Sequence, residues 1–279
     1  MEPCKYNVEV AWMKMGFRIV NASKLAELQP KELLDEIRKG LDVTYNADDD
    51  EMVLLFKSQS GGGAGWRFVP SVFNPKSLQD AKEIILTEEN GVKTDVRWEK
   101  ETPVLMRELR RMFGRYGKGR TVVDYGCGIG RLSKGLCSSG YNVVGVDMSE
   151  QMRAMAVEYV NSRRFSVVSP EEFEGMVATG FRCDIAIAVW VLQHCLEPEK
   201  TFNLIRESMK SDGLFFIMNN SKSRALPSIV NGAFKWFDDG KDIFGIVEKS
   251  MEKEKDVEIA TKDIGLVRGF YKAMLYRKP

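Results

Sequence analysis

A group of closely spaced glycines beside a carboxylate is the part of the sequence best suited to binding a ligand. The segment 122–132 reads VVDYGCGIGRL and places Gly126, Gly128 and Gly130 at alternate positions between an expected strand and an expected helix. Glycines let the backbone approach a ligand closely, and the first turn of a helix presents unpaired N–H groups with a partial positive charge. Asp124 comes just before these glycines. The segment therefore predicts a binding loop for a small ligand.

Three details distinguish this loop from a dinucleotide site, which also uses a glycine-rich turn. Asp124 would repel a pyrophosphate and attract a cation, and Arg131 stands where the dinucleotide pattern has its last glycine. Asp147 ends the next expected strand, where a carboxylate can accept both ribose hydroxyls, and Met148 can cover one face of an adenine. These residues suit a positively charged ligand that carries adenosine without a pyrophosphate. They disfavour an NAD-dependent oxidoreductase.

Two more residues are candidates for the chemistry itself. Trp190 ends an apolar strand, at the edge where open α/β sheets bind ligands, and it is equally compatible with a place in the core. His194 is the only histidine in the chain and is therefore the candidate general base. The alternative for His194 is a structural role in the turn that follows the strand.

The histidine and cysteine content argues against several other kinds of chemistry. With one histidine and five cysteines that form no CxxC pair, we expect no metal site. A Ser-His-Asp hydrolase is disfavoured because the GxSxG pattern is missing from the sequence. The odd number of cysteines favours free thiols, and hence a protein of the reducing cytoplasm.

Charge and hydropathy narrow the choice of partners. The 279 residues include 41 basic and 40 acidic side chains, for a net charge of +1, which disfavours nucleic acid as a partner. The sequence lacks an apolar run of the roughly 20 residues that cross a bilayer, and the first residues do not resemble a secretory signal. We therefore expect a protein that binds a small molecule and no membrane. The oligomeric state is left open.

The residues from 101 to 279 alternate expected strands and helices, as an α/β sheet requires. Helices are expected over 102–113, 131–138, 150–160 and 198–209, and another begins at Pro170 with Ser169 and Glu172 in a capping box. The pattern predicts a mostly parallel sheet of seven strands with helices on both faces. These strands are expected at 121–125, 141–147, 165–168, 183–190, 214–218, 257–261 and 270–277.

Residues 1–100 form a different part of the chain, an expected α+β extension. A helix is expected over 30–40, a strand over 52–56, a glycine-rich connection over 60–66 and a second helix that begins at Pro75 after Asn74. We place the boundary between the two parts at residues 100 and 101.

The segments VVDYGCGIGRL and NVVGVDMSEQM resemble the class I S-adenosylmethionine-dependent methyltransferases, over roughly residues 103 to 279. The resemblance implies a Rossmann-like sheet of seven strands whose last two form an antiparallel hairpin. It also implies that the loop from Gly126 to Gly130, with Cys127, passes under the methionine part of the cofactor. Asp124 would orient the cofactor's amino group.

The remaining site residues also follow from the resemblance. Asp147 would hold the ribose and Met148 would pack on the adenine. Relatives often have an acidic residue after the third strand to accept the adenine amino group, and here Ser169 stands in that place. The resemblance further places Val189 and Trp190 in the pocket wall and Trp98 and Glu99 on the substrate side, since the region before the first helix often covers the active site.

The expected function is transfer of a methyl group from S-adenosyl-L-methionine to a small molecule by in-line displacement, leaving S-adenosyl-L-homocysteine. The strand over 183–190 ends without the Asp/Asn-Pro-Pro-aromatic signature of enzymes that methylate amino groups in DNA. One alternative is a methyltransferase acting on RNA or protein, with residues 1–100 as its recognition module. Another is a regulatory protein that binds the cofactor without catalysis.

Overall fold

The computed structural model describes residues 45–47, 51–57, 66–69, 73, 75–88, 91–221, 223–230, 233–259 and 270–279. The chain divides into two compact units, Met1–Phe73 with Ala225–Asp239 and Asn74–Arg224 with Gly240–Pro279. The boundary expected between residues 100 and 101 falls inside a continuous helix of the second unit.

The first unit contains two small antiparallel sheets in its described part. Strands β1 (Tyr45–Ala47), β2 (Glu51–Lys57) and β3 (Trp66–Val69) form one of them, and β2 contains the strand expected over 52–56. Strands β9 (Leu226–Val230) and β10 (Ala233–Phe237) form the other. The helix expected over 30–40 and the glycines of 60–65 lie outside the described residues.

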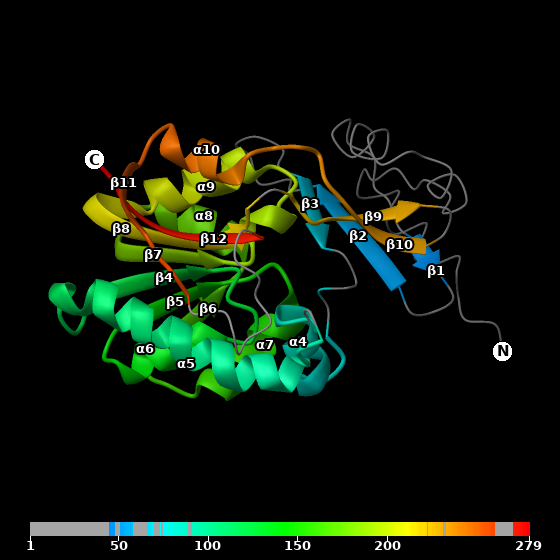
Figure 1. Cartoon of the computed structure of the whole chain (residues 1–279), viewed down its shortest axis with the longest axis horizontal. Coiled ribbons are helices and arrows are strands. Elements are labelled where there is room, and N and C mark those ends of the chain that lie inside the picture. The colour runs from blue at the N-terminus through cyan, green and yellow to red at the C-terminus, as the bar shows by residue number, and fades with distance from the viewer. Residues whose placement is uncertain are drawn as a thin grey trace. The chain divides into compact units, whose positions relative to one another are not determined.

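The second unit is built on a mixed sheet of seven strands in the order β11-β12-β8-β7-β4-β5-β6 (Figure 1). The neighbours from β8 to β6 run parallel, whereas β12 is antiparallel to both β8 and β11. The expected fold class is confirmed, including the antiparallel pair at the C-terminal end of the sequence. The strands are β4 (Thr121–Tyr125), β5 (Asn142–Val146), β6 (Phe165–Val168), β7 (Cys183–Val189), β8 (Met209–Asn220), β11 (Glu252–Asp256) and β12 (Tyr271–Arg277).

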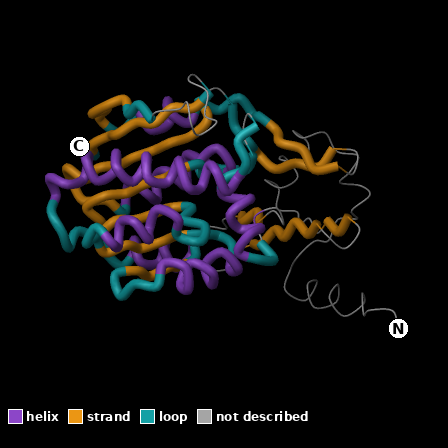
Figure 2. Tube along the Cα trace, turned by 60° about the horizontal axis from the view of Figure 1, so that its bottom comes forward, coloured by secondary structure: helices purple, strands orange, loops and turns teal. Residues whose placement is uncertain are grey.

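Helices cover both faces of this sheet, as Figures 1 and 2 show from two directions. Helices α5 (Thr94–Phe113), α6 (Arg131–Ser138) and α7 (Glu150–Val160) lie on one face. Helices α8 (Pro170–Ala178), α9 (Pro198–Glu207) and α10 (Ile243–Glu248) lie on the other. Because both faces are covered, the central strand β7 is apolar and buried along almost its whole length.

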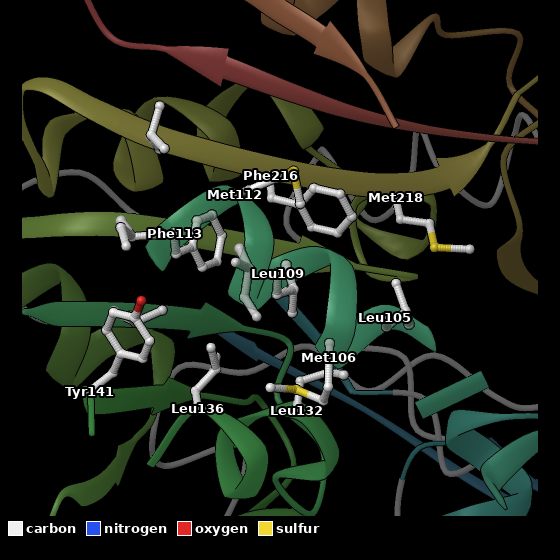
Figure 3. Packing of buried hydrophobic residues seen from close by; sticks show 14 of the residues in the cluster. Leu105, Met106, Leu109, Met112, Phe113, Leu132, Leu136, Tyr141, Phe216 and Met218 are labelled. Atoms are coloured by element: carbon white, nitrogen blue, oxygen red, sulfur yellow. The ribbon is translucent and has the colours of Figure 1, made fainter. Parts of the chain in front are cut away.

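The core on the α5 face is made by long apolar side chains from α5, α6 and the central strands. In Figure 3, Leu105, Leu109 and Met112 of α5 lie beside Phe216 and Met218 of β8. Leu105, Leu109, Phe216 and Met218 have no exposed surface. Burying a side chain of this size contributes roughly 1.5–3 kcal/mol, so these contacts fix α5 firmly on the sheet.

Helices α4 (Leu78–Ile85) and α5, which precede β4 in the chain, begin at other residues than the sequence predicts. Helix α5 was expected to begin at residue 102 but begins at Thr94 and continues through Pro103, which has no N–H for the carbonyl of Glu99. Arg97 and Glu101 form a buried i,i+4 ion pair that supports the added turns. Helix α4 begins after Pro75, because Ser77 is the residue whose side chain caps it.

Two strand predictions also needed correction. The sixth strand was expected over 257–261, but β11 comes earlier, at Glu252–Asp256, and is exposed throughout. Val257 and Ile259 are buried in the core beyond the strand, so their apolar character marks core positions and not the edge strand. The fifth strand, β8, is longer than expected and includes the turn residue Asp212 at φ 60°, where its register with β7 shifts.

Candidate functional site

The glycine loop lies between β4 and α6 and is fixed to the end of β5. Gly126, Gly128 and Gly130 have φ angles of 73°, 53° and 81°, a region that favours glycine. The N–H of Gly126 donates to the carbonyl of Val146 at 2.7 Å. The predicted strand–loop–helix arrangement is therefore present, with the loop at the carboxyl ends of two adjacent parallel strands.

Close packing is a second reason why two of these positions need glycine, because a side chain there would have no room. A Cβ on Gly126 would overlap the side chain of Val191, and a Cβ on Gly128 would come within 2.6 Å of Ile85 Cδ1. Cys127, between them, is buried, and burial raises the pKa of its thiol well above the ordinary value. Cys127 is thus a packing residue of the loop and an unreactive thiol at neutral pH.

Asp124 lies beneath the loop, 3% exposed, with Oδ2 accepting a hydrogen bond of 2.6 Å from the Ser133 hydroxyl. Burial raises the pKa of this carboxyl to about 6, against the lowering effects of Ser133 and of the positive charge on Arg131. At neutral pH, which is above this pKa, the buried group is an anion. The role that the sequence predicts for Asp124, attraction of a cation, stays a prediction, because the contact of its Oδ2 in the structure is to Ser133 of α6.

Asp147 joins the end of β5 to the glycine loop. Its Oδ2 accepts from the N–H of Gly128 at 2.8 Å, and its Oδ1 accepts from the N–H of Ser149 at 2.9 Å. Burial raises the pKa of Asp147, while these hydrogen bonds and Arg153 act against the rise. Each carboxylate oxygen keeps a second lone pair, so two hydroxyl donors can still be accepted. The following Met148 is half-buried.

Ser169 is engaged in the capping box that the sequence predicts at the start of α8. Its hydroxyl oxygen accepts from the N–H of Glu172 at 3.2 Å and donates to Glu171 Oε2 at 2.9 Å. The sequence reasoning overlooked Glu171, a half-buried acidic residue close to the end of β6. The sequence did contain a signal for Glu171. A capping box uses one glutamate, here Glu172, so the adjacent Glu171 is available for another role.

Trp190 follows β7 with a left-handed backbone, at φ 60°. This conformation is costly for a bulky residue and persists only where surrounding contacts enforce it. Here the N–H of Trp190 donates to the carbonyl of Met218 at 2.7 Å, and its ring meets Tyr271 edge-on with centroids 6.3 Å apart. Val189, the last residue of β7, is half-buried.

A buried charged network, which the sequence did not predict, contacts this tryptophan through Glu101. Glu101 has no exposed surface, and its Oε1 accepts from the indole N–H of Trp190 at 3.2 Å. The same carboxylate contacts Arg97 at 2.9 Å and Arg131 at 3.2 Å. Burial lowers the pKa of Arg131, and Glu101 opposes that effect. The network connects α5, the start of α6 and the end of β7.

Trp98 and Glu99, expected on the substrate side, both lie on α5. Trp98 packs against the apolar cluster of Ala81, Ile129 and Met152 and meets Tyr159 edge-on at 6.1 Å. Glu99 is exposed. The region expected to precede the first helix is thus part of that helix, and Trp98 is held in place by its packing.

His194 ends the short 3-10 helix η3 (Leu192–His194) and is half-buried. Its Nε2 lies 3.2 Å from the amide nitrogen of Gln193. Within the described part of the chain, no cluster of three or more His, Cys, Asp or Glu side chains is arranged to hold a metal ion. The helices among these residues are too short or too polar to cross a bilayer.

Residues 97–239 match the family model described as a methyltransferase domain. A ubiquinone biosynthesis O-methyltransferase of Coxiella burnetii is 30% identical over 118 residues, which are 42% of this chain and 50% of that protein. The protein of the same name from Glaesserella parasuis is 29% identical over 122 residues, or 41% and 52% of the two chains. The matched stretch thus spans about half the length of these curated relatives.

Among solved structures, the N-methyltransferase NodS of Bradyrhizobium japonicum, in complex with S-adenosyl-L-homocysteine, is similar with a TM-score of 0.49. It is 12% identical, and the similarity covers 65% of this chain and 88% of that one.

Proposed function

Because the chain belongs to the methyltransferase-domain family, whose methyl donor is S-adenosyl-L-methionine, we propose that it methylates a small-molecule acceptor. The observation that carries the proposal is the position of Asp147, whose carboxylate bridges the end of β5 and the N–H of Gly128. A carboxylate at this strand end is suited to bind ribose hydroxyls.

The polar groups of the site fit the cofactor. Asp147 keeps one lone pair on each oxygen for the ribose hydroxyls, and the buried anion Asp124 favours a cationic ligand near the glycine loop. We assign Met148 to the adenine face and Val189 and Trp190 to the pocket wall. For the adenine amino group we propose Glu171, with Ser169 as its positioning residue through their 2.9 Å hydrogen bond.

When bound, S-adenosylmethionine supplies a methyl group on a sulfonium leaving group, so that transfer to an acceptor nucleophile is one in-line displacement. The chain's own task is then to hold the two reactants in line and to exclude water. Trp190 and the glycine loop are suited to that task because their backbones are held by hydrogen bonds to neighbouring strands.

The names of the relatives support a small acceptor. The relatives with about 30% identity are named for O-methylation in ubiquinone biosynthesis, which favours an oxygen nucleophile on a small molecule.

The family model begins at residue 97, so the preceding residues are outside the shared domain. We propose that residues 1–100 contribute to acceptor recognition, with Glu99 as a substrate-side candidate, and that the protein works in the cytoplasm.

Thermal unfolding with S-adenosylhomocysteine tests the proposal. A ligand that binds only the folded state, at 100 times its Kd, adds about 2.7 kcal/mol and raises the midpoint by a few degrees. We expect this shift in the parent protein, its loss in Asp147→Ala and its retention in Asp256→Ala, an exposed aspartate on the edge strand β11. NAD should give no shift.

A folded parent protein that S-adenosylhomocysteine does not stabilise would contradict the cofactor assignment. Transfer of labelled methyl to a panel of small hydroxyl, amine and thiol compounds then tests the acceptor class. Binding without transfer to any of them, together with labelling of RNA or protein, would replace the small-molecule proposal.

A further inference from the structure

The end of β8 carries a backbone donor that the neighbouring strand β7 no longer meets. In a strand, backbone groups of every second residue point to the same side. The carbonyl of Met218 accepts from the N–H of Trp190 at 2.7 Å, on the side of β7. The next N–H on that side belongs to Asn220, and β7 has already ended at Val189. A side chain replaces the missing strand: Gln193 Oε1 accepts from the N–H of Asn220 at 2.8 Å.

This hydrogen bond settles which end of the Gln193 amide is oxygen. A backbone N–H can only donate, so the atom facing Asn220 must be the acceptor, and the amide NH₂ must point the other way. Gln193 is 6% exposed, which leaves its side chain little freedom to turn over. The NH₂ group therefore faces Nε2 of His194, at 3.2 Å.

The orientation of Gln193 in turn determines the state of the imidazole. An amide NH₂ can only donate, so Nε2 of His194 must be the acceptor and carry no proton. A neutral imidazole with a bare Nε2 has its proton on Nδ1. We propose that Gln193 is a positioning residue that holds His194 as the neutral Nδ1–H tautomer. The lone pair at Nε2 is occupied by the amide, so His194 is a hydrogen-bonding group of the site and not its general base.

The tautomer follows from these contacts alone, whereas its meaning for the reaction rests on the proposed function. If methyl transfer occurs, the acceptor loses its proton to some group other than His194. The leaving group of the in-line displacement is already activated, so such a reaction does not require a strong base from the protein.

Nitrogen NMR of the ring tests the inference directly, because the chain has one histidine. The untagged protein, labelled with ¹⁵N in the imidazole, gives a single ring pattern in long-range ¹H–¹⁵N correlation spectra. At pH 8 we expect Nδ1 to show the shift of a protonated nitrogen and Nε2 that of a bare one. A protonated Nε2 in the parent protein would overturn the proposal.

Substitution of Gln193 tests whether this residue is the cause. Gln193→Glu keeps an oxygen for Asn220 and replaces the donor toward His194 with an acceptor, so we expect Nε2 to become protonated. Gln151→Glu makes the same change at an exposed position of α7 and should leave the ring pattern unchanged. An unaltered pattern in a folded Gln193→Glu variant would overturn the role of Gln193. If that variant does not fold, the parent spectrum decides.

Binding of S-adenosylhomocysteine, measured on the same samples, separates this inference from the proposed function. Failure to bind with the predicted ring pattern would contradict the proposed cofactor and leave the tautomer established. Binding together with a protonated Nε2 would support the proposed cofactor and contradict the tautomer.

Discussion

The indole N–H of Trp190 donates to Glu101 Oε1 at 3.2 Å, although 89 residues separate the two along the chain. Glu101 lies in the middle of α5, without exposed surface, between the guanidinium groups of Arg97 and Arg131. Trp190 follows β7 with its backbone at φ 60°. The contact therefore ties the helix that precedes the sheet to the sheet edge where we place the cofactor, and it helps to hold the tryptophan in its unfavourable conformation.

Glu101→Ala should lower the free energy of unfolding by about 3–5 kcal/mol, because it leaves two buried arginines without their partner. Glu101→Gln keeps an acceptor for Trp190 and should lower the free energy of unfolding by a smaller amount. Urea denaturation measures both. Glu99→Ala, an exposed change two residues away on the same helix, should stay within about 0.5 kcal/mol of the parent. Equal effects at the two positions would show that the network contributes no stability.

Asp124 should make stability depend on pH between about 4 and 6. Burial raises the pKa of its carboxyl from 3.8 to about 6, so in that window the folded state binds a proton that the unfolded state has released. Stability due to this group is therefore greatest below the unfolded pKa and falls as pH rises through the folded one. A shift of about 2 pKa units corresponds to roughly 3 kcal/mol.

Asp124→Asn should remove this dependence, since the amide oxygen can still accept from Ser133 and does not titrate. The measurement is the difference in unfolding free energy between the parent and Asp124→Asn at pH 4 and at pH 7. We expect the parent to lose stability relative to the variant as pH rises. A difference that stays constant would mean that Asp124 titrates at its ordinary pKa.

Gly126→Ala should destabilise the protein by about 2–5 kcal/mol. A non-glycine residue at φ 73° costs about 1–2 kcal/mol, and the added Cβ overlaps Val191, which adds an overpacking cost of about 1–3 kcal/mol. The double variant Gly126→Ala/Val191→Ala should recover the packing part once the cost of Val191→Ala alone is subtracted. The two parts are separated by chemical denaturation of all three variants.

Gly175→Ala is the matched control for Gly126. Gly175 lies within α8 at an ordinary φ, and a Cβ there would meet no atom within 4 Å. Alanine in that place should stabilise the protein by about 0.5–1 kcal/mol, because it restricts the unfolded chain and favours the helix. Loss of stability at both glycines alike would contradict the reasoning from φ and packing.

Local patterns in the sequence predicted most of the larger unit correctly. The strand–glycine–helix segment around Gly126, the capping box of Ser169 with Glu172 and the apolar strand β7 were all found where expected. These features depend on residues close together in sequence, through alternation, helix capping and backbone freedom. The expected number of seven strands was also correct, although the sixth strand was misplaced.

Contacts between distant residues decided the rest. Because proline favours the first turn of a helix, the sequence pattern predicted that α5 begins at residue 102. The turns before Pro103 are supported by Glu101, whose partners include Arg131 and Trp190 far along the chain. The sequence prediction placed the sixth strand on apolar residues, but β11 is an exposed edge strand. Its position depends on pairing with β12, which the local sequence does not show. In the same way, the sequence named His194 as the lone imidazole, but only the fold brought Gln193 between it and Asn220. Residue types determine which chemistry is available, whereas the orientation of each polar group depends on hydrogen-bond partners that only the folded chain assembles.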